Sequence, residues 1–469
     1  MNKKCLLFFC IVLLLNFFLN GKFELHYDEA YYWVLSQNLS LSYYDHPPMI
    51  AFIIRLFSIF GHSEFAVRLS ALSTTCITVI VMYKFAKRMF GQQVADITCM
   101  LALAIPLIQA LCFITTPDSP LLMFWSLTLY CFYVGVFETK AKYIYLTGVF
   151  AGFALVSKYT AVLIFPSLFI FLILSNNYRK YIFRKEIYIA LIIACVMFMP
   201  VIYWNYQHDW ASFKFQFQHG IDSKKELNFA TPFDYLGGQV LISGILIFIA
   251  MLFFTFKYIK INIQNDKLAF LFWPFVFVFC FFGYRSLFQH MEANWPAPMY
   301  VSGIVWLSYW LKITNIKWVY RTAVGLILIV LILGKFPLTF VPNAMYNTQF
   351  NGNINVFYGS HDLLEQIKPY IHKNDIILAC DYGNASHAWF YLNLPRVCVL
   401  SNFTYSHMYQ YWNNDLPQSI NHALYICDND DKTAFNNLKD NFRKIELLDI
   451  AKYNNKIGSK VMYIYKASN

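Results

Sequence analysis

Residues 187–204 read IYIALIIACVMFMPVIYW, a run of eighteen residues without a charged side chain. A helix needs about 20 mainly apolar residues to cross the hydrocarbon core of a bilayer, so this run predicts a membrane span. Ten further apolar runs predict a polytopic α-helical membrane protein with about 11–13 transmembrane helices. These runs are Cys5–Asn20, Phe65–Tyr83, Val94–Ile114, Pro120–Phe137, Tyr143–Val156, Ala161–Leu174, Leu236–Phe256, Leu268–Phe282, Met299–Leu311 and Trp318–Gly334.

The composition supports this prediction. Of the 469 residues, 58% are hydrophobic and only 13% are charged, and the chain contains 47 Phe and 34 Tyr. Soluble domains are roughly 45–50% apolar and about 25% charged, so a set of soluble domains is excluded. Disordered, collagen-like and small disulfide-rich classes are excluded for the same reason.

The positive charge is concentrated in the membrane part. Residues 1–339 contain 26 Lys and Arg against 15 Asp and Glu, whereas residues 340–469 contain 11 of each, which accounts for the net charge of +11. If Lys3 and Lys4 are cytoplasmic and the first run is a retained anchor, seventeen basic residues lie on the cytoplasmic side and seven or eight on the outer side. The cytoplasmic set includes Arg88, Lys140 and Lys267. This asymmetry follows the positive-inside rule and places the C-terminal part on the outer face. No basic face interleaved with aromatic residues suggests a nucleic-acid partner.

The chain is predicted to form two domains, a transmembrane domain over residues 1–339 and a small α/β domain over residues 340–469. In the second domain, strand-length apolar runs cover residues 375–380, 396–400 and 423–427, and residues 386–392 have a helical pattern. The eleven Cys include no CxxC pair, and a Cys380–Cys398 disulfide is possible although the spacing does not support it.

The loop after the first run carries two polar motifs. HYDEAYYW, residues 26–33, places Asp28, Glu29 and Tyr32 just beyond a membrane span, where polar groups tend to be functional. YYDHPP, residues 43–48, adds Asp45 and His46 before two prolines that force an extended turn. The alternatives are an aromatic interface anchor and a plain turn. Asp45 and His46 are candidate metal ligands, although two ligands do not make a site.

Three charged residues lie at predicted span ends on the same outer face. Arg68 is either a bidentate phosphate clamp or a side chain that snorkels to headgroups. Asp118 is either functional or the N-cap of the following helix. Lys158 lies in an outer turn, where topology disfavours positive charge. Asn205, Asn294 and Trp295 complete a polar and aromatic rim, for which an interface belt is the alternative.

Six motifs occur in a fixed order over roughly the first 300 residues. They are DEAYYW from Asp28, DHPP from Asp45, TPD ending at Asp118, SKYT around Lys158, WN ending at Asn205 and NWP from Asn294. In these motifs the chain resembles bacterial glycosyltransferases related to protein O-mannosyltransferases and to the aminoarabinose lipid A transferases, a family 39-like group. The resemblance implies the C-type membrane glycosyltransferase fold, a polyprenyl-phosphate sugar donor and an active site on the outer face. The aminoarabinose transferases typically have EKPP where this chain has DHPP.

The resemblance implies that Asp28 and Glu29 form the acidic first-loop motif and that Arg68 helps to bind the donor phosphate. The other roles are predicted from residue type and position. Asp28, Glu29 and Asp118 are the catalytic candidates, and Arg68, Lys158 and His46 are the candidates for binding the donor phosphate. Tyr32, Asp45, Asn205, Asn294 and Trp295 are the candidates for binding the sugar or the acceptor. No nucleotide sugar is expected, and a divalent metal requirement stays undecided. Asp28 would be the base for a hydroxyl acceptor, whereas a phosphate acceptor needs none.

The predicted function is sugar transfer to lipid A or a related glycolipid at the outer face of a bacterial inner (plasma) membrane, with the C-terminal domain on the periplasmic side. Lys214, Lys224, Lys225 and Arg285 lie in predicted outer loops and would attract an anionic headgroup. A protein O-glycosyltransferase is the alternative enzyme. A membrane transporter or a sensor is the alternative outside enzymes, although the chain shows no internal repeat of the kind common in transporters.

Overall fold

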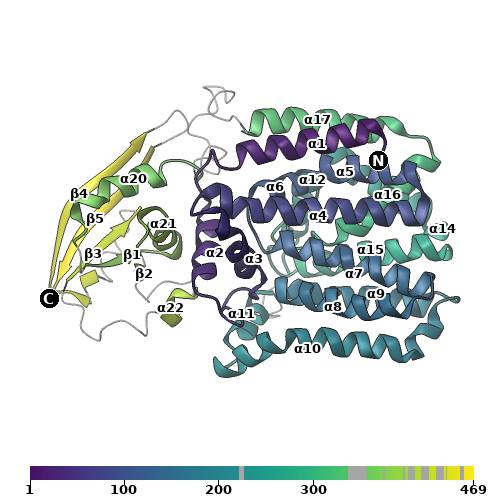
Figure 1. The fold of residues 1–469 in the computed structure, drawn as a ribbon, viewed down its shortest axis with the longest axis horizontal. Helices are drawn as coiled ribbons and strands as arrows, with labels where there is room; N and C mark the ends of the chain where they lie inside the picture. The colour runs from purple at the N-terminus through teal and green to yellow at the C-terminus, as the bar shows by residue number, and fades with distance from the viewer. Residues whose placement is uncertain are drawn as a thin grey trace. The chain divides into compact units, whose positions relative to one another are not determined.

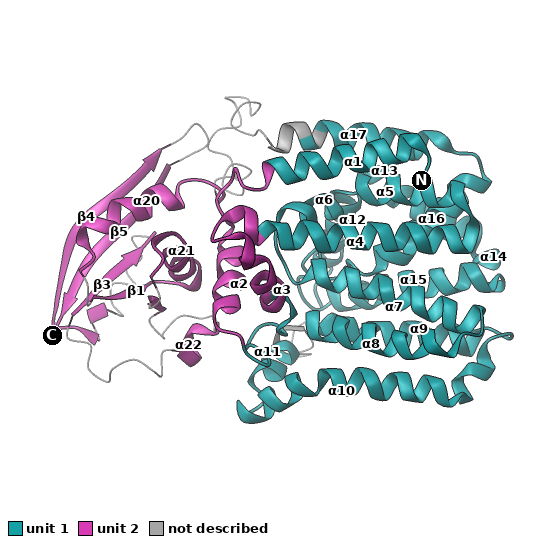
Figure 2. Ribbon diagram, viewed as in Figure 1, with its two compact units in different colours: residues 1–18, 40–50, 68–332 teal, residues 19–39, 51–67, 333–469 magenta. Residues whose placement is uncertain are grey.

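The computed structural model divides the chain into two compact units, coloured separately in Figure 2. The first unit comprises residues 1–18, 40–50 and 68–332, and the second comprises residues 19–39, 51–67 and 333–469. The second unit thus contains two segments from the first 67 residues in addition to the C-terminal region. The structure describes residues 1–220, 227–335, 356–372, 375–394, 397–399, 407–412, 422–428, 438–439, 441–454 and 459–469.

The first unit is helical (Figure 1), and each of the eleven expected runs is occupied by one helix or by two successive helices. Its elements are α1 (Lys3–Leu19), α4 (Glu64–Phe90), α5 (Gln92–Ala104), α6 (Pro106–Phe113), α7 (Asp118–Phe137), α8 (Ala141–Ser157), η2 (Tyr159–Leu163), α9 (Ile164–Leu174), η3 (Arg179–Phe183), α10 (Lys185–Gln207), α11 (Ala211–Gly220), α12 (Thr231–Ser243), α13 (Ile245–Lys257), α14 (Ile259–Gln264), α15 (Asp266–Ser286), α16 (Met299–Ile313) and α17 (Lys317–Lys335).

Four of these helices, α4, α7, α10 and α15, are long and apolar enough to cross a membrane. The number rises to six when each of two bent helix pairs counts as one span. Judged by helix length and hydropathy, the structure has fewer spans than the predicted 11–13. The reason is that several apolar helices are short; α1 and α8, for example, have 17 residues each.

Both bent pairs have a cause in the sequence. α5 and α6 meet at 65°, where Pro106 is the first residue of α6 and has no N–H to continue α5. α12 and α13 meet at 111°, where Gly244 has a φ of +82°, a backbone conformation that glycine adopts at little cost.

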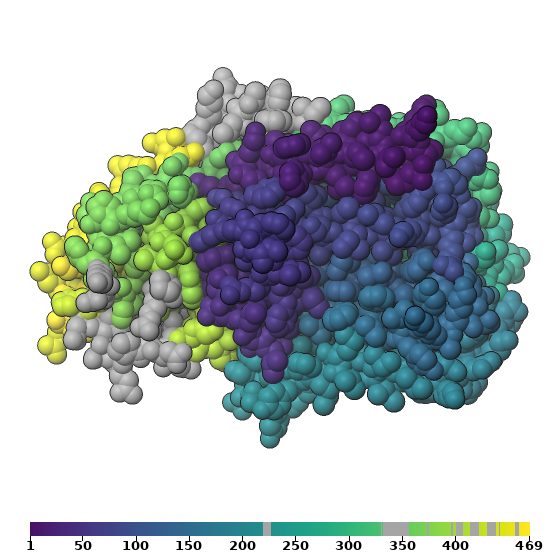
Figure 3. Space-filling view, in the orientation of Figure 1, coloured from purple at the N-terminus to yellow at the C-terminus, as the bar shows by residue number. Residues whose placement is uncertain are grey.

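Close packing holds the helices of the first unit together, and Figure 3 shows them filling its visible face. α8 packs against both α7 and α10. A Cβ at Gly148 of α8 would overlap the backbone carbonyl of Ala190 in α10, so glycine permits this close approach. The opposite side of α10 exposes large apolar side chains, as expected for a helix that faces lipid; they include Ile192, Val196 and Met199.

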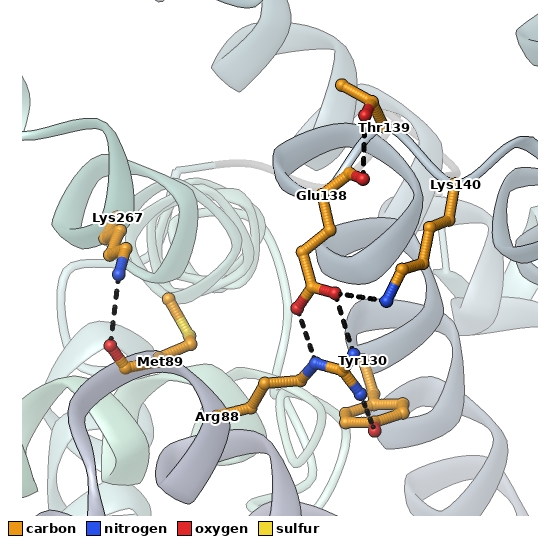
Figure 4. Close-up of polar contacts among 7 residues, drawn as sticks. All are labelled: Arg88, Met89, Tyr130, Glu138, Thr139, Lys140 and Lys267. Carbon is orange, nitrogen blue, oxygen red and sulfur yellow. Dashed lines mark hydrogen bonds and ion pairs between the residues drawn. The ribbon is translucent and has the colours of Figure 1, made fainter.

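One end of the first unit carries a cluster of ion pairs (Figure 4). Glu138, which follows α7, accepts hydrogen bonds from Arg88 Nη2 of α4 (2.7 Å) and from Lys140 Nζ (2.8 Å). Lys267 of α15 donates to the backbone carbonyl of Met89 at 3.2 Å. Arg88, Lys140 and Lys267 were all predicted to lie on the cytoplasmic side, and the structure places them at one end of the helices. We call this the basic end.

The second unit is built on a five-stranded mixed sheet in the order β2-β1-β3-β5-β4. The first three strands are parallel, whereas β5 pairs antiparallel with both β3 and β4. The predicted strands and the predicted helix are confirmed within the described residues. Its elements are α2 (Tyr27–Gln37), α3 (Met49–Phe57), η1 (Ser58–Phe60), α20 (Ser360–Ile367), η5 (Lys368–Tyr370), β1 (Ile376–Ala379), α21 (Tyr382–Leu392), β2 (Val397–Val399), α22 (Tyr409–Trp412), β3 (His422–Cys427), β4 (Lys444–Asn454) and β5 (Ser459–Ser468).

Hydrogen bonds attach the early segments to this sheet domain. The backbone carbonyl of Leu25 lies 3.0 Å from His387 Nε2. The backbone N–H of Leu25 donates to the hydroxyl of Tyr391 at 2.8 Å. The Glu24 carboxylate accepts from the backbone N–H groups of Ser360 (2.6 Å) and His361 (3.2 Å). Burial lowers the pKa of His387 to about 3, so this residue is neutral at pH 7. Residues 19–39 therefore form part of the C-terminal domain.

The proposed Cys380–Cys398 disulfide is wrong. Cys380 pairs with Cys427, with a Cα–Cα distance of 5.2 Å, and Cys398 is free and buried. The sheet register explains the choice, because Ala379 lies opposite Ile426 on β3, so the next residue on each strand brings the two Cys together. On β2, Cys398 lies opposite Leu378, two residues before Cys380.

We expect Glu138→Gln to destabilise the protein at neutral pH. Its ion pairs lower the pKa of Glu138 to about 2 from its usual 4.5, with the Arg88 hydrogen bond the largest cause. The carboxylate therefore stabilises the fold above pH 4.5, and this contribution disappears as the pH falls towards 2. Partly exposed ion pairs contribute about 0.2–1 kcal/mol each, so the free energy of unfolding should fall by about 1 kcal/mol at pH 7.

Thermal unfolding of the detergent-purified protein at pH 7 and at pH 3 measures this difference. Glu186→Gln is the matched control, because the Glu186 carboxylate forms no ion pair among the described residues. Equal losses in both variants, or a loss that does not shrink at low pH, would contradict the assignment.

Candidate functional site

A buried polar cluster lies at the opposite end of the first unit from the basic end. Lys158 Nζ donates to Asp118 Oδ1 at 2.7 Å, and Asn294 Nδ2 donates to Asp118 Oδ2 at 2.6 Å. The exposed fraction is 2% for the Asp118 side chain and 10% for the Lys158 side chain. The fold thus brings three of the predicted site residues together, although Asp118 and Asn294 are 176 positions apart in the sequence. We call these three residues the outer cluster.

Two members of the outer cluster lie at helix ends, and the third lies in a loop. Asp118 is the first residue of α7, Lys158 directly follows α8, and Asn294 lies in the loop before α16. The N-cap of α7 is Pro117, and no side-chain cap hydrogen bond is present there. The interpretation of Asp118 as an N-cap is therefore wrong, since its two oxygens accept from Lys158 and Asn294 instead.

Burial explains why Lys158 and Asp118 must pair. Transferring an isolated charge out of water costs several kcal/mol, and a close opposite charge with satisfied hydrogen bonds offsets that cost. One donor of the Lys158 ammonium is used by Asp118, and an ammonium has three. The arrangement therefore holds a desolvated cation in place and leaves it capacity to bind an anionic oxygen.

Arg68, near the start of α4, is 0% exposed, and its guanidinium lies 4.6 Å from the centre of the Phe113 ring. The snorkelling interpretation is therefore wrong, because a snorkelling side chain keeps its charge in water. Arg68 and Arg88 are twenty residues apart on α4, or about 30 Å at 1.5 Å per residue. Arg68 thus lies at the end of α4 opposite to the basic end.

The DHPP motif is held in a compact turn in the first unit. The backbone N–H of Tyr43 donates to the carbonyl of His46 at 3.2 Å, and Gln216 of α11 donates to the carbonyl of Asp45 at 2.8 Å. Asp45 is buried and His46 half-buried. Burial, and secondarily the charge of Asp45, raise the pKa of the Tyr43 hydroxyl above its usual range.

No metal site emerges at this motif among the described side chains. The one group of three potential metal ligands found among the described residues lies in the second unit. It consists of Cys380, Cys427 and Asp428, and its two Cys form the disulfide.

Asn205 forms hydrogen bonds within the fold and Trp295 packs near an aromatic ring, and their roles in binding the sugar or the acceptor stay predictions. Asn205 is fully buried, and its side chain accepts from the N–H of Phe213 at 3.1 Å and donates to the carbonyl of Val201 at 3.0 Å. It thereby closes the turn between α10 and α11. Trp295 is half-buried, and its ring lies 6.3 Å from that of Phe282.

The acidic motif of residues 26–33 lies in the second unit, on α2. Glu29 is fully buried and forms a capping box, in which its side chain accepts from the N–H of His26 at 3.0 Å. Asp28 is more accessible, with 36% of its side chain exposed, and it accepts from the hydroxyl of Tyr382 at 2.8 Å. Tyr32 is buried on the same helix. Of the two carboxylates, Asp28 is better placed to meet a ligand.

The structure thus unites Asp118, Lys158 and Asn294, and it assigns Asp28, Glu29 and Tyr32 to the other unit. We predicted that these two sets of residues share one site, and this stays a prediction. Two contacting residues were not predicted, namely Phe113 beside Arg68 and Tyr382 beside Asp28. Neither has a signal in the sequence, because Tyr382 is 354 residues away from Asp28 and Phe113 is one of 47 Phe.

Residues 45–204 match the family model described as dolichyl-phosphate-mannose-protein mannosyltransferase. This segment contains Asp45, His46, Arg68, Asp118 and Lys158. The lipid A galacturonosyltransferase RgtD of Rhizobium johnstonii is 29% identical over 310 residues. That alignment covers 66% of this chain and 63% of the relative, so the similarity spans less than two thirds of the relative's length.

Solved structures share the fold. ArnT from Cupriavidus metallidurans bound to undecaprenyl phosphate is similar with a TM-score of 0.70 at 13% identity, covering 98% of this chain and 97% of that one. The oligosaccharyltransferase of Archaeoglobus fulgidus in its apo form gives 0.54 at 11% identity, over 90% of this chain and 70% of that one. The ArnT-like fold confirms the expected polytopic helical architecture with a C-terminal sheet domain. Residues 45–204 are thus similar to this family of membrane glycosyltransferases, and the chain as a whole has an ArnT-like fold.

Proposed function

We propose that this protein transfers a sugar from a polyprenyl-phosphate donor to lipid A or a related glycolipid, at the periplasmic face of a bacterial inner membrane. The observation that carries the proposal is the outer cluster, in which Asp118 holds the buried ammonium of Lys158 at 2.7 Å inside the segment that matches the family model. A desolvated, positioned cation suits a reaction whose leaving group is a phosphate.

The reaction breaks the bond between C1 of the sugar and the phosphate oxygen, and it forms a bond from C1 to an acceptor oxygen. The transition state resembles an oxocarbenium ion, as in glycoside hydrolysis, while the departing polyprenyl phosphate gains negative charge. Preorganised cations beside that phosphate stabilise the transition state more than the ground state. Lys158 and Arg68 are our candidates for this role.

Asp118 is proposed to act by positioning Lys158. Its second oxygen is bound by Asn294, so the carboxylate is held from two sides. A fixed ammonium needs little reorganisation when the phosphate charge develops, which is the advantage of a preorganised site.

Asp28 is proposed to act on the acceptor. With a hydroxyl acceptor, its carboxylate would remove the proton as the new bond forms. With a phosphate acceptor, no proton needs to be removed, and Asp28 would orient the donor or the acceptor. The hydroxyl of Tyr382 donates to Asp28 and fixes the direction of its carboxylate in either case.

Two similar proteins support the choice of donor and acceptor. The ArnT structure with a TM-score of 0.70 holds undecaprenyl phosphate, and the 29% identical relative is a lipid A galacturonosyltransferase. Lys214 and Arg285 were predicted to lie in outer loops; the structure places them in α11 and in the last turn of α15, and there they would attract an anionic headgroup. Lys224 and Lys225, which were predicted to assist, lie outside the described residues. The name of the matching family model favours protein O-glycosylation as the second candidate.

We expect Arg68→Lys to reduce transfer about 10²-fold, because an ammonium cannot make the bidentate phosphate contact of a guanidinium and lost donors cost about 10²–10³ in rate. Arg88→Lys, at the basic end of the same helix, is the matched control and should retain full activity. Membranes incubated with a radiolabelled polyprenyl-phosphate sugar provide the assay. Equal activity of the two variants would remove Arg68 from the mechanism.

A double-substitution cycle separates catalysis from folding in the outer cluster. Lys158→Met leaves Asp118 as an uncompensated buried charge and should cost about 3–5 kcal/mol of stability. Adding Asp118→Asn removes that charge and should restore most of the melting temperature, since apolar replacement of a buried pair is often neutral.

Transfer by the double variant should nevertheless stay about 10²–10³-fold below wild type, because the phosphate-binding cation is absent. Thermal unfolding and transfer rate are measured on the same detergent-purified samples. Recovery of both quantities in the double variant would show that the pair is purely structural.

The acceptor is identified by mass spectrometry of lipid A from cells with and without the gene. We expect a hexose- or pentose-sized mass difference that disappears with the gene and returns with the wild-type copy. Complementation with Asp28→Asn tests the base, whose loss costs about 10²–10⁴ in rate for a hydroxyl acceptor and less for a phosphate acceptor. Unchanged lipid A beside a lost protein glycoform would promote the second candidate.

A further inference from the structure

We infer that the basic end of the first unit binds an anionic glycerophospholipid in a cavity formed by α1, α5, α16 and α17. The cavity has a volume of about 830 Å³, which lies within the range of about 300–1,000 Å³ typical of ligand pockets. It is independent of the outer cluster, because Gln93 in its wall is only five residues beyond Arg88 at the basic end.

Four cations surround this cavity. Lys4 is near the start of α1, Lys312 near the end of α16, and Lys317 and Arg321 lie in the first turns of α17. All four residues are exposed, and none makes a side-chain hydrogen bond or ion pair among the described residues. Lys and Arg donors on several helices around one cavity favour a phosphate ligand.

One carboxylate, Asp96 of α5, also lines the cavity and is 5% exposed. It is already bonded, since it accepts from the side chain of Asn2 at 2.9 Å and from Gln92 at 2.9 Å. No cation of the cavity lies within ion-pair distance of it among the described residues. The four cations therefore exceed the acidic charge by three, and their excess remains available to a ligand.

Part of the remaining wall is apolar. Phe8, Met100 and Val324 line the cavity beside the cations. Two helices that contribute to the wall expose apolar side chains of the kind that face lipid, with exposed fractions of 62% for Leu7 of α1 and 50% for Leu326 of α17. A ligand that meets both parts of the wall needs an anionic head and hydrocarbon tails. A free phosphate compound would use only the cations.

The location fits the same ligand class. Basic pockets between helices at the cytoplasmic surface bind anionic headgroups, and each nearby Lys or Arg adds to the attraction of the negatively charged leaflet. The predicted orientation places this end of the helices in the cytoplasmic leaflet. A phospholipid here would brace α1 against α17, because the cavity takes residues from both helices.

Native mass spectrometry of the full-length protein, titrated with dioleoyl phosphatidylglycerol, tests the inference. Lys317→Gln/Arg321→Gln should weaken binding about 30-fold, which corresponds to about 1 kcal/mol for each cation. Lys84→Gln/Lys260→Gln is the matched control, since it removes two exposed lysines outside the cavity wall and should not change the affinity. Equal weakening in both double variants would overturn the inference.

Asp96→Asn tests the inference in the opposite direction, because it removes a negative charge from the cavity and leaves all four cations in place. Removal of the single carboxylate should tighten phosphatidylglycerol binding several-fold, and unchanged or weaker binding by this variant in its folded form would contradict the inference. Dioleoyl phosphatidylcholine should bind at least tenfold more weakly than phosphatidylglycerol. If glycerol phosphate binds as tightly as the lipid, the ligand is a soluble phosphate compound and the lipid assignment is overturned.

Discussion

The ion pair between Asp118 and Lys158 is the constraint on which the first unit depends. A buried carboxylate and a buried ammonium are each costly alone, so α7 and α8 must hold one relative position to keep them 2.7 Å apart. At the other end of the same two helices, Glu138 bonds to Lys140 and to Arg88. The antiparallel pair is thus fixed by charge at both ends and by apolar packing between them.

The distance between these two charged ends has a physical origin. Asp118 and Glu138 are twenty residues apart on one helix, about 30 Å at 1.5 Å per residue, which equals the hydrocarbon thickness of a typical bilayer. α7 carries no other charged residue between them, so chemistry at one surface is separated from the loops at the other by an apolar layer. Lys158 is retained on the sparsely charged surface because its charge is compensated by Asp118.

The sequence was sufficient to predict the apolar helices, the strands β1–β3 and the contribution of Asp118, Lys158 and Asn294 to one region, because hydropathy and charge act over short stretches of chain. It could not predict which partner each side chain chooses. Cys380 pairs with Cys427 because of a strand register, and Asp28 meets Tyr382 because α2 and α21 pack together. The burial of Arg68 could not be predicted for a related reason, since it involves Phe113, a residue 45 positions further along the chain.

The second unit combines segments from the beginning and the end of the chain, and this has a consequence for biosynthesis. Residues 19–39 are translated more than 300 residues before α21, against which α2 packs. A ribosome adding about 5–20 residues per second needs on the order of 20–70 s to cover that interval. During this time Tyr31 and Trp33, which are buried in the finished protein, have none of their C-terminal neighbours. The nascent chain must therefore carry an unsatisfied aromatic surface outside its membrane helices, where chaperones or the interfacial region of the bilayer can shield it until the last domain is complete.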